Sequence, residues 1–400
     1  MGDLGIFFKN YLNSNSIFKN KKSLQASYIP DTIMHREDET RNIASILAPA
    51  LRTDLPSNVF IYGKTGTGKT LVMHHIAEHL NTTAKENTVP LRTLYINCKL
   101  KKSTDTEYRL LAELSRMLGE DVPTTGLPTS DIYDAFTRAI DKENGIVIIV
   151  LDEIDQLVKK IGDEILYSLT RLNSDLKKSQ IAIVGISNDM TFADHLEPRV
   201  RSSLSEEDVV FPPYNAMQLQ EILSTRVKEA FKDDVIKQGV IEKCAAFAAR
   251  DHGDARRALD LLRVAGEICE RNSAEELKIE HIDMAEKKIE KDRVLDIVKS
   301  QPKQSQAALY SILSVTDIDK FFFTGDIYET YKQVCQSTAL RPLTMRRISD
   351  IIAELDTLGI INAQVMSKGR YGRTRKISLS LPPGVAPKLQ DVLGESLGFR

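Results

Sequence analysis

The sequence has no tryptophan and only four cysteines, and aromatic residues make up only 6% of the chain. The cysteines are Cys98, Cys244, Cys269 and Cys335, which lie far apart and show no CxxC spacing. They therefore fit neither a disulfide framework nor a structural zinc site. Their number and spacing favour a reducing, intracellular compartment.

Long hydrophobic runs are also missing. The longest aliphatic stretch, Ile146–Leu151, has six residues, whereas a membrane helix needs about 20. The N-terminal residues mix lysines with phenylalanines and lack the apolar core and cleavage site of a secretory signal. We therefore expect a cytoplasmic protein with no membrane partner.

Neither sign of charge is in excess. The 54 lysine and arginine residues are balanced by 56 acidic residues, which gives a formal net charge of -2 over 400 residues. A wholly basic, histone-like protein is excluded, so any polyanion must meet a local basic patch. The 42% hydrophobic content excludes global disorder and suffices for the cores of two or three domains.

Short aliphatic strands alternate with helical patterns from residue 58 to residue 211. The predicted strands are Val59–Tyr62, Thr93–Cys98, Ile146–Leu151, Ile181–Ile186 and, more weakly, Val209–Phe211. Their interiors are continuously apolar, which is typical of parallel strands covered on both faces. The pattern predicts an α/β fold with a parallel sheet.

The pattern changes twice after this region. Pro212-Pro213 is followed by about 80 residues with helical periodicity only. Beyond Arg293 the helices give way to two short strands, Ile360–Met366 and Lys376–Leu381, as in a winged helix. The predicted divisions are an N-terminal extension (1–25), an α/β domain (26–213), a helical domain (214–293) and a winged-helix domain (294–400).

A phosphate-binding motif follows the first predicted strand. Gly63-Lys64-Thr65-Gly66-Thr67-Gly68-Lys69-Thr70 matches GxxxxGK[ST] and precedes a predicted helix. The glycines let backbone N–H groups converge on phosphate oxygens. Lys69 would reach the outer phosphates and Thr70 would bind magnesium. With the next residue, Leu71, these positions form the predicted nucleotide-binding loop.

Acidic and amide side chains end two later strands. Asp152 and Glu153 follow Ile146–Leu151, so Asp152 would hold magnesium and Glu153 would polarise an attacking water. This pair predicts hydrolysis and not only binding. Asn188 would orient the water or touch the terminal phosphate, although asparagine also ends strands because it favours turns.

One motif on the helix after the phosphate loop is misleading. Residues 75–79 spell HxxEH, an inverted zinc-protease signature. We reject zinc because this helix must pack against the sheet and the sequence offers no third ligand. His74, His75 and His79 are interpreted as helix-surface residues.

The C-terminal domain carries the basic residues that predict binding of duplex DNA. Residues 343–359 form a strongly amphipathic pattern with Thr344 as N-cap and Gly359 as stop. Arg341, Arg346 and Arg347 lie at its N-terminal end, where a recognition helix enters the major groove. The hairpin tip combines Tyr371 with five cations, Lys368, Arg370, Arg373, Arg375 and Lys376. Such a wing suits phosphates or a minor groove, although winged helices also bind proteins and a basic turn can be merely solvated.

The segments GKTGTGKT, IVIIVLDEID, GISND, EPRVRSSL and HGDARRALD occur in this order and resemble the AAA+ ATPases. With FPPYNAMQLQEILSTR and a winged helix, the chain more narrowly resembles the archaeal replication initiators related to the eukaryotic origin recognition and cell-division-control proteins. The resemblance implies a five-stranded AAA+ P-loop sheet, a helical lid and a C-terminal DNA-binding winged helix.

The resemblance also implies further site residues. Tyr214 and Arg226 would line the nucleotide at the hinge with the lid, and Arg256 would sense its outer phosphates. Either Arg199 or Arg201 would act in trans on a partner's nucleotide, and the sequence does not choose between them. The alternatives are hinge packing for Tyr214 and solvated helix cations for the two lid arginines.

The implied function is that of an initiator that uses ATP/ADP and Mg. It would recognise double-stranded origin DNA, alone or with paralogous initiators, and help recruit or load the replicative minichromosome maintenance helicase. Hydrolysis would be slow and regulatory, and the protein would associate with the nucleoid. Residues 116–131 would be either a second DNA contact or a surface loop. An ATP-gated transcription regulator or scaffold is the alternative; a clamp-loader subunit fits less well because the chain ends in a basic wing.

Overall fold

The computed structural model describes residues 16–25, 28–30, 32–99, 105–123, 126, 128–142, 144–204, 206–315, 322–367, 373–381 and 384–399. The chain divides into two compact units, Met1–Ile282 and Asp283–Arg400, and each is described by itself. None of the helices in the described stretches combines the length and the apolar character that crossing a bilayer requires. The three-domain division stays a prediction.

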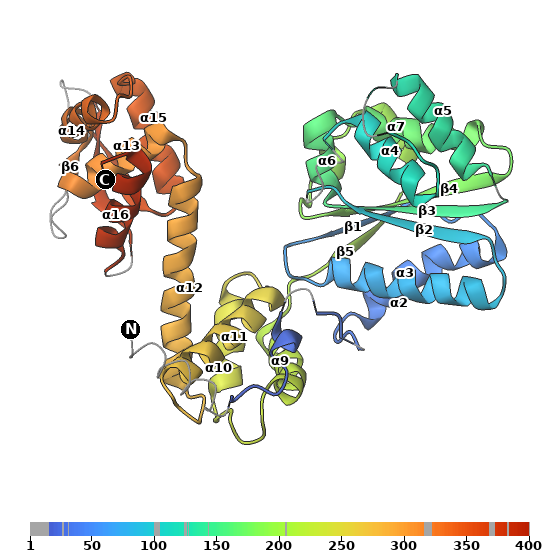
Figure 1. Cartoon of the computed structure of the whole chain (residues 1–400), viewed down its shortest axis with the longest axis horizontal. Helices are drawn as coiled ribbons and strands as arrows, with labels where there is room; N and C mark the ends of the chain where they lie inside the picture. Colours follow the sequence, from blue (N-terminus) through green and yellow to red (C-terminus); the bar gives the residue numbers. More distant parts are fainter. Residues whose placement is uncertain are drawn as a thin grey trace, which may run out of the picture. The chain divides into compact units, whose positions relative to one another are not determined.

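The first unit is built on a parallel sheet with the strand order β2-β3-β4-β1-β5 (Figure 1). The strands are β1 (Val59–Gly63), β2 (Leu91–Asn97), β3 (Gly145–Asp152), β4 (Ser179–Ser187) and β5 (Glu207–Phe211). The predicted α/β class is confirmed. Because parallel strands end at the same edge, β1, β3 and β4 bring the phosphate loop, the paired acids and Asn188 together.

Helices cover both faces of the sheet, as the apolar strands predict (Figure 1). One face packs against α2 (Glu37–Leu47) and α3 (Lys69–Glu86). The opposite face packs against α4 (Glu107–Met117), α5 (Thr129–Ile140), α6 (Ile154–Ile161), α7 (Glu164–Arg171) and α8 (Pro198–Leu204). Short 3-10 helices occupy Ala48–Arg52 (η2), Leu172–Ser174 (η4) and Phe192–His195 (η5).

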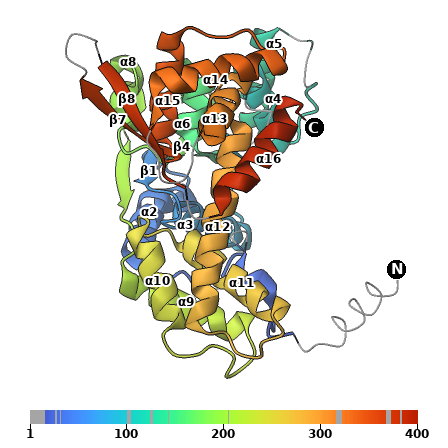
Figure 2. The same ribbon diagram turned by 90° about the vertical axis from the view of Figure 1, so that its left-hand side faces the viewer.

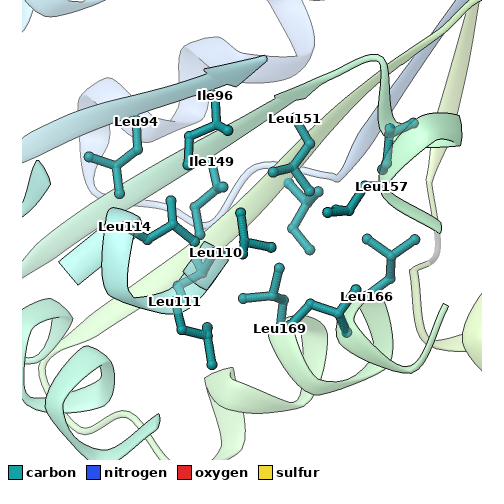
Figure 3. Close-up of a cluster of buried hydrophobic side chains, with 14 of the residues drawn as sticks. Leu94, Ile96, Leu110, Leu111, Leu114, Ile149, Leu151, Leu157, Leu166 and Leu169 are labelled. Carbon is teal, nitrogen blue, oxygen red and sulfur yellow. The ribbon is translucent and has the colours of Figure 1, made fainter. Parts of the chain in front are cut away.

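The side chains of β3 show why both faces of the sheet are apolar. Successive residues of a strand point to opposite faces, so Ile149 and Leu151 meet the leucines of α4 and α7, while Ile148 and Val150 pack against α3. Figure 3 shows the first of these clusters between the sheet and the helices. Burying each such side chain contributes about 1.5–3 kcal/mol, which holds the strand ends in fixed positions.

The rest of the first unit is helical. The lid helices are α9 (Ala216–Ala230), α10 (Val240–Arg250) and α11 (Ala255–Arg271), and α12 (Ile279–Ser300) begins in this unit and ends in the next. A short helix near the N-terminus, η1 (Lys21–Leu24), contacts α9 and α11. The Phe18 ring packs in a tilted arrangement against Phe231, which directly follows α9, with 4.8 Å between the ring centroids. The described part of the predicted N-terminal extension therefore packs on the lid helices.

The second unit contains helices and a β-hairpin, as predicted. The helices are α13 (Lys303–Val315), α14 (Thr324–Ser337), α15 (Met345–Thr357) and α16 (Val385–Leu397). The hairpin consists of β7 (Ile361–Ser367) and β8 (Arg373–Leu379), and a short strand, β6 (Phe322–Phe323), extends its sheet in the order β6-β8-β7. The hairpin lies next to α15 (Figure 2). Ile348, Ile352 and Ile377 join helices and hairpin in one core.

Candidate functional site

The phosphate loop connects β1 to α3 and needs its glycines for two reasons. Gly66 and Gly68 have φ of 76° and 94°, which a residue with a Cβ rarely adopts. A Cβ on Gly66 would lie 1.7 Å from the Asp254 carboxylate, and one on Gly68 would lie 2.8 Å from the Tyr214 hydroxyl. The glycines therefore also let the start of α11 and the hinge approach the loop.

Lys69 is the buried cation of the loop, with 5% of its surface exposed. Its Nζ donates hydrogen bonds to the carbonyls of Gly63 and Lys64, at 2.7 and 2.9 Å, and to Asn188 Oδ1 at 2.8 Å. Burial lowers the pKa of Lys69 to about 8, against the opposing attraction of Asp152. The structure thus brings Asn188 to the loop, because β4 lies between β1 and β3.

Asp152 is buried at the end of β3, and both of its carboxylate oxygens accept hydrogen bonds. Oδ2 accepts from Thr70 Oγ1 at 3.1 Å, Tyr95 OH at 2.6 Å and Asn97 Nδ2 at 3.4 Å. Oδ1 accepts from the backbone N–H of Glu153 at 2.9 Å. A hydroxyl and a carboxylate held side by side are the hard oxygen ligands that Mg²⁺ prefers, so the donor set fits this ion.

Glu153 has a strained backbone. Its φ of 55° and ψ of 47° place it in the left-handed region, which costs a non-glycine residue about 1–3 kcal/mol and is typical of functional sites. Its carboxylate lies 3.5 Å from Lys99 Nζ. This conformation turns the chain sharply from β3 into α6 while Glu153 stays at the edge where the phosphate loop lies.

A cavity of about 350 Å³ adjoins the loop, and its size falls in the range of small-molecule sites. Of the predicted nucleotide-binding residues, those that line it are Gly66, Gly68, Thr70, Leu71, Tyr214, Arg226 and Arg256. The remaining predicted positions, Gly63, Lys64, Thr65, Thr67 and Lys69, belong to the loop beside it. The structure therefore brings the hinge and lid residues to the phosphate loop, as the resemblance implies.

The lid contributes buried and exposed cations to this cavity. Arg226 is 7% exposed, its guanidinium lies 4.7 Å from the Tyr28 ring centroid, and burial lowers its pKa. Arg256 is exposed in the first turn of α11, where Asp254 accepts its backbone N–H at 2.8 Å. The N–H of Ala255 donates to Gly66 O at 3.2 Å. The start of α11 is thus fixed on the phosphate loop.

Sequence reasoning missed Arg36, a central side chain of the site that is 2% exposed. Its Nε donates to Thr67 O at 2.9 Å and its Nη2 donates to Pro212 O at 2.5 Å. The guanidinium stacks 3.9 Å from the centroid of Tyr214. Arg36 therefore ties the phosphate loop to the hinge. It has no motif of its own, but it comes shortly after a largely apolar stretch, residues 28–34, whose described residues line the cavity.

The histidines of α3 differ from one another. His74 is not simply a surface residue, because its ring stacks on Tyr95 at 4.0 Å between centroids and lines the cavity. Burial lowers its pKa, which favours the neutral ring. His75 and His79 lie 4.4 Å apart, ring to ring. Within the described part of the chain, no three His, Cys, Asp or Glu side chains form a group that would hold a metal ion.

The two candidate trans arginines lie on α8, and both carry acidic partners. Arg199 pairs with Glu164 at 2.5 Å and with Glu197 at 2.8 Å. Arg201 pairs with Asp194 at 3.1 Å. Each guanidinium side chain is about half exposed, so the two candidates stay open.

In the second unit, the predicted recognition helix is α15. The Thr344 hydroxyl caps it by accepting the N–H of Arg347 at 3.4 Å. Arg341, Arg346 and Arg347 are exposed at this end, and Arg347 lies 3.8 Å from both Asp350 and Glu354. Of the predicted wing residues, Lys368, Arg370, Tyr371 and the side chain of Arg373 lie outside the described residues, and Arg375 is half-buried on β8.

Comparisons with known proteins match nearly the whole length of the chain. Three family models match it: the AAA domain over residues 53–188, the Cdc6 AAA+ ATPase-type lid domain over 220–287, and the C-terminal winged helix domain of CDC6 over 296–386. Among solved structures, the Orc1 protein of Aeropyrum pernix in complex with DNA has a TM-score of 0.81 at 44% identity, with 95% of this chain and 97% of that chain covered. The ORC2 protein of the same organism, solved in ADPNP and ADP complexes, shares the fold with a TM-score of 0.59 at 21% identity over 96% of this chain and 98% of that chain.

Curated relatives agree with these matches. The ORC1-type DNA replication protein of Thermococcus onnurineus is 50% identical, with 95% of this chain and 92% of the relative covered. The ORC1-type DNA replication protein 1 of Methanosarcina mazei is 49% identical, with 94% and 90% covered. The chain therefore belongs to the family of ORC1-type DNA replication proteins, with an AAA+ domain, a Cdc6-type lid and a winged helix.

Proposed function

We propose that this chain is an ATP-dependent initiator that hydrolyses ATP slowly and recognises double-stranded origin DNA, where it helps recruit or load the replicative helicase. One observation carries the ATPase part of the proposal. The ends of three strands gather a buried lysine, a hydroxyl–carboxylate pair and a strained glutamate around one loop beside a nucleotide-sized cavity. This set contains each part that phosphoryl transfer to water requires.

Each part has a distinct role in the proposed mechanism. Lys69 would exchange its carbonyl partners for the outer phosphates and stabilise their charge. Thr70 and Asp152 would hold Mg²⁺, which when bound neutralises phosphate charge. Glu153 would take a proton from the attacking water. Asn188 would orient that water or hold the terminal phosphate.

The lid would change its position according to the state of the bound nucleotide. Tyr214 and Arg226 line the cavity from the hinge and from α9, and Arg256 would sense the outer phosphates from α11. Because the loop and α11 are already joined through Gly66 and Ala255, a shift of the loop on hydrolysis would move the lid. Arg199 or Arg201 would complete a partner's site, and such an arginine contributes about 10³–10⁵ in rate.

DNA binding by this chain is supported by the Aeropyrum pernix Orc1 complex with DNA and by the exposed arginines of α15. A role in replication is supported by the relatives, which are named DNA replication proteins, while recruitment of the minichromosome maintenance helicase stays a prediction. Partnership with paralogous initiators and a location at the nucleoid stay predictions.

Two substitutions test the nucleotide site. Lys69→Ala removes the phosphate-binding cation, and we expect nucleotide affinity to fall about 100-fold or more by calorimetry. Glu153→Gln removes the base, so it should bind ATP normally while turnover falls about 10²–10⁴-fold. Glu276→Gln, which changes an acid paired with Lys237 on the lid surface, is the control. Normal hydrolysis by Glu153→Gln would show that the base is another group.

Footprinting tests the role in replication. The ATP-bound Glu153→Gln protein, mixed with fragments of its own genome, should protect repeats near an origin and retain the helicase in a pull-down. Protection of promoters without helicase contact would instead identify a transcription regulator and overturn the replication proposal.

A further inference from the structure

Strand β2 contributes Tyr95, whose hydroxyl reaches the carboxylate of Asp152, the residue proposed to hold Mg²⁺. β2 pairs in parallel with β3, so that Asn97 lies opposite Asp152 and Tyr95 lies two residues earlier, opposite Val150. The Tyr95 hydroxyl donates to Asp152 Oδ2 at 2.6 Å, and Asn97 Nδ2 is the more distant donor at 3.4 Å. The phenol is thus the main contribution of β2 to this carboxylate.

The position of Tyr95 is itself fixed by α3. Its ring packs against the core on the α3 face of the sheet and stacks on His74, with 28° between the ring planes. His74 lies one helical turn after Thr70, whose hydroxyl reaches the same Asp152 oxygen. Helix α3 therefore helps to position both hydroxyls that meet at Asp152 Oδ2. It carries Thr70 itself, and one turn later its His74 ring stacks against Tyr95.

These contacts leave the Asp152 carboxylate little freedom to rotate. Oδ1 is held by the backbone N–H of Glu153, and Oδ2 is held by Thr70 and Tyr95. Thr70 and His74 line the cavity, whereas Tyr95 is not among the residues that line it. Tyr95 is therefore placed to act through the carboxylate and not on the nucleotide. Partners that orient a metal ligand in this way typically change metal affinity 10–100-fold when they are removed.

We propose that Tyr95 is a positioning residue that orients Asp152 for Mg²⁺. This inference rests on the proposed function, because it requires the ion at Thr70 and Asp152. The hydroxyl then sets metal affinity, while the nucleotide's contacts with the loop and the cavity do not depend on it.

Tyr95→Phe tests this role because it keeps the ring and its stacking and removes only the hydroxyl. We expect Mn²⁺, titrated by electron paramagnetic resonance into the ADP-loaded protein, to bind about tenfold more weakly than in the wild type. The affinity of Tyr95→Phe for ADP in EDTA should stay within twofold of the wild-type value. Its turnover, lowered by weaker metal binding, should recover at high Mg²⁺. Tyr133→Phe is the matched control, because its hydroxyl points to Ser168 O at 3.5 Å, away from the site.

A second variant separates the hydrogen bond from ring packing. With 4-aminophenylalanine at position 95, a donor returns to the same place, and Mn²⁺ affinity should recover. Mn²⁺ affinity of Tyr95→Phe within twofold of the wild type, or no recovery with the amino analogue, would overturn the positioning role. A wild type that binds no metal–nucleotide complex would overturn the proposed function together with this inference. A wild type that binds it without hydrolysis would overturn hydrolysis alone.

Discussion

The nucleotide site and the predicted DNA-binding surface both rely on cations, but they hold them differently. Lys69 is buried and donates three hydrogen bonds of 2.7–2.9 Å, two of them to carbonyls of its own loop. Arg347 is 56% exposed, and its acidic neighbours lie 3.8 Å away. The first cation has one geometry fixed by the fold, while the second is held by weak, screened contacts.

This difference teaches what each site can contribute. A buried, preorganised cation pays its desolvation cost on folding, which shifts its pKa and makes a single residue decisive. Exposed arginines act through their number, since each phosphate contact releases counterions and adds to the salt dependence of binding. Single substitutions should therefore disable the nucleotide site but only weaken the DNA surface.

The largest effect expected on DNA comes from reversing two wing charges. Arg370→Glu with Arg373→Glu removes two phosphate contacts and adds repulsion, so DNA affinity at about 0.1 M salt should fall about 100-fold. The slope of log K against log salt should decrease in magnitude by about 2 units, and nucleotide affinity should not change. Fluorescence anisotropy over a salt series measures both quantities.

The control for this pair reverses two exposed lysines elsewhere in the second unit. Lys299→Glu with Lys388→Glu makes the same change in net charge outside the predicted surface. If the wing variant has the same salt slope as this control, the hairpin tip is not part of the DNA interface.

The parts of the fold that the sequence could predict are those with repeated local patterns. The central strands β1, β3 and β4 are buried on both faces and read as continuous aliphatic runs, whereas the edge strands β2 and β5 are only partly buried. All five predicted strands of the parallel sheet are present, with ends within two residues. β6 has only two residues, Phe322–Phe323, and carries no pattern to detect. The hairpin and the α15 cap at Thr344 were predictable because turn glycines and the capping hydroxyl are local signals.

The candidate site divides in the same way. The loop and the paired acids are contiguous motifs, whereas Arg36 and Tyr95 act through contacts with residues 31 and 57 positions away. Nothing in their local spacing distinguishes them from ordinary surface or core residues, because the tertiary path creates their partners. The roles carried over from the resemblance, such as those of Arg226 and Arg256, stay predictions although both residues line the cavity.

A pH titration distinguishes the buried Lys69 from the exposed arginines of the DNA-binding surface. The effect expected here is intermediate in size. The pKa of Lys69 is about 8, below its usual value of 10.5, because of burial. A bound triphosphate favours the charged form, so binding should take up a proton above pH 8, and affinity should fall about tenfold per pH unit from 8 to 10. Lys69→Arg stays charged throughout this range and should lose the dependence.

The same shift has a defined sign for stability. The unfolded chain holds the Lys69 proton more tightly than the folded one, so the folded state gains stability as pH rises from about 8 to 10.5. Calorimetric titration of ATP and thermal melts at each pH measure the two effects. An affinity independent of pH over this range would mean that the nucleotide does not meet the Lys69 ammonium.

The smallest expected effect concerns the acids that flank Arg347. Asp350→Asn with Glu354→Gln removes two negative charges from α15 and frees the guanidinium, and exposed pairs of this kind are worth about 0.2–1 kcal/mol each. DNA affinity should therefore rise about two- to fivefold at low salt, with a salt slope steeper by up to about 0.9 as Arg347 gains a phosphate.

The matched change on α16, Asp391→Asn with Glu395→Gln, alters net charge equally and distinguishes a local effect from a general one. If both pairs raise affinity alike, the gain is due to net charge and α15 has no special place on the DNA. If the α15 pair instead lowers affinity, the acids orient Arg347 toward the DNA. The recognition surface would then be preorganised like the nucleotide site, and the contrast between a fixed cation and a free one would fail at this residue.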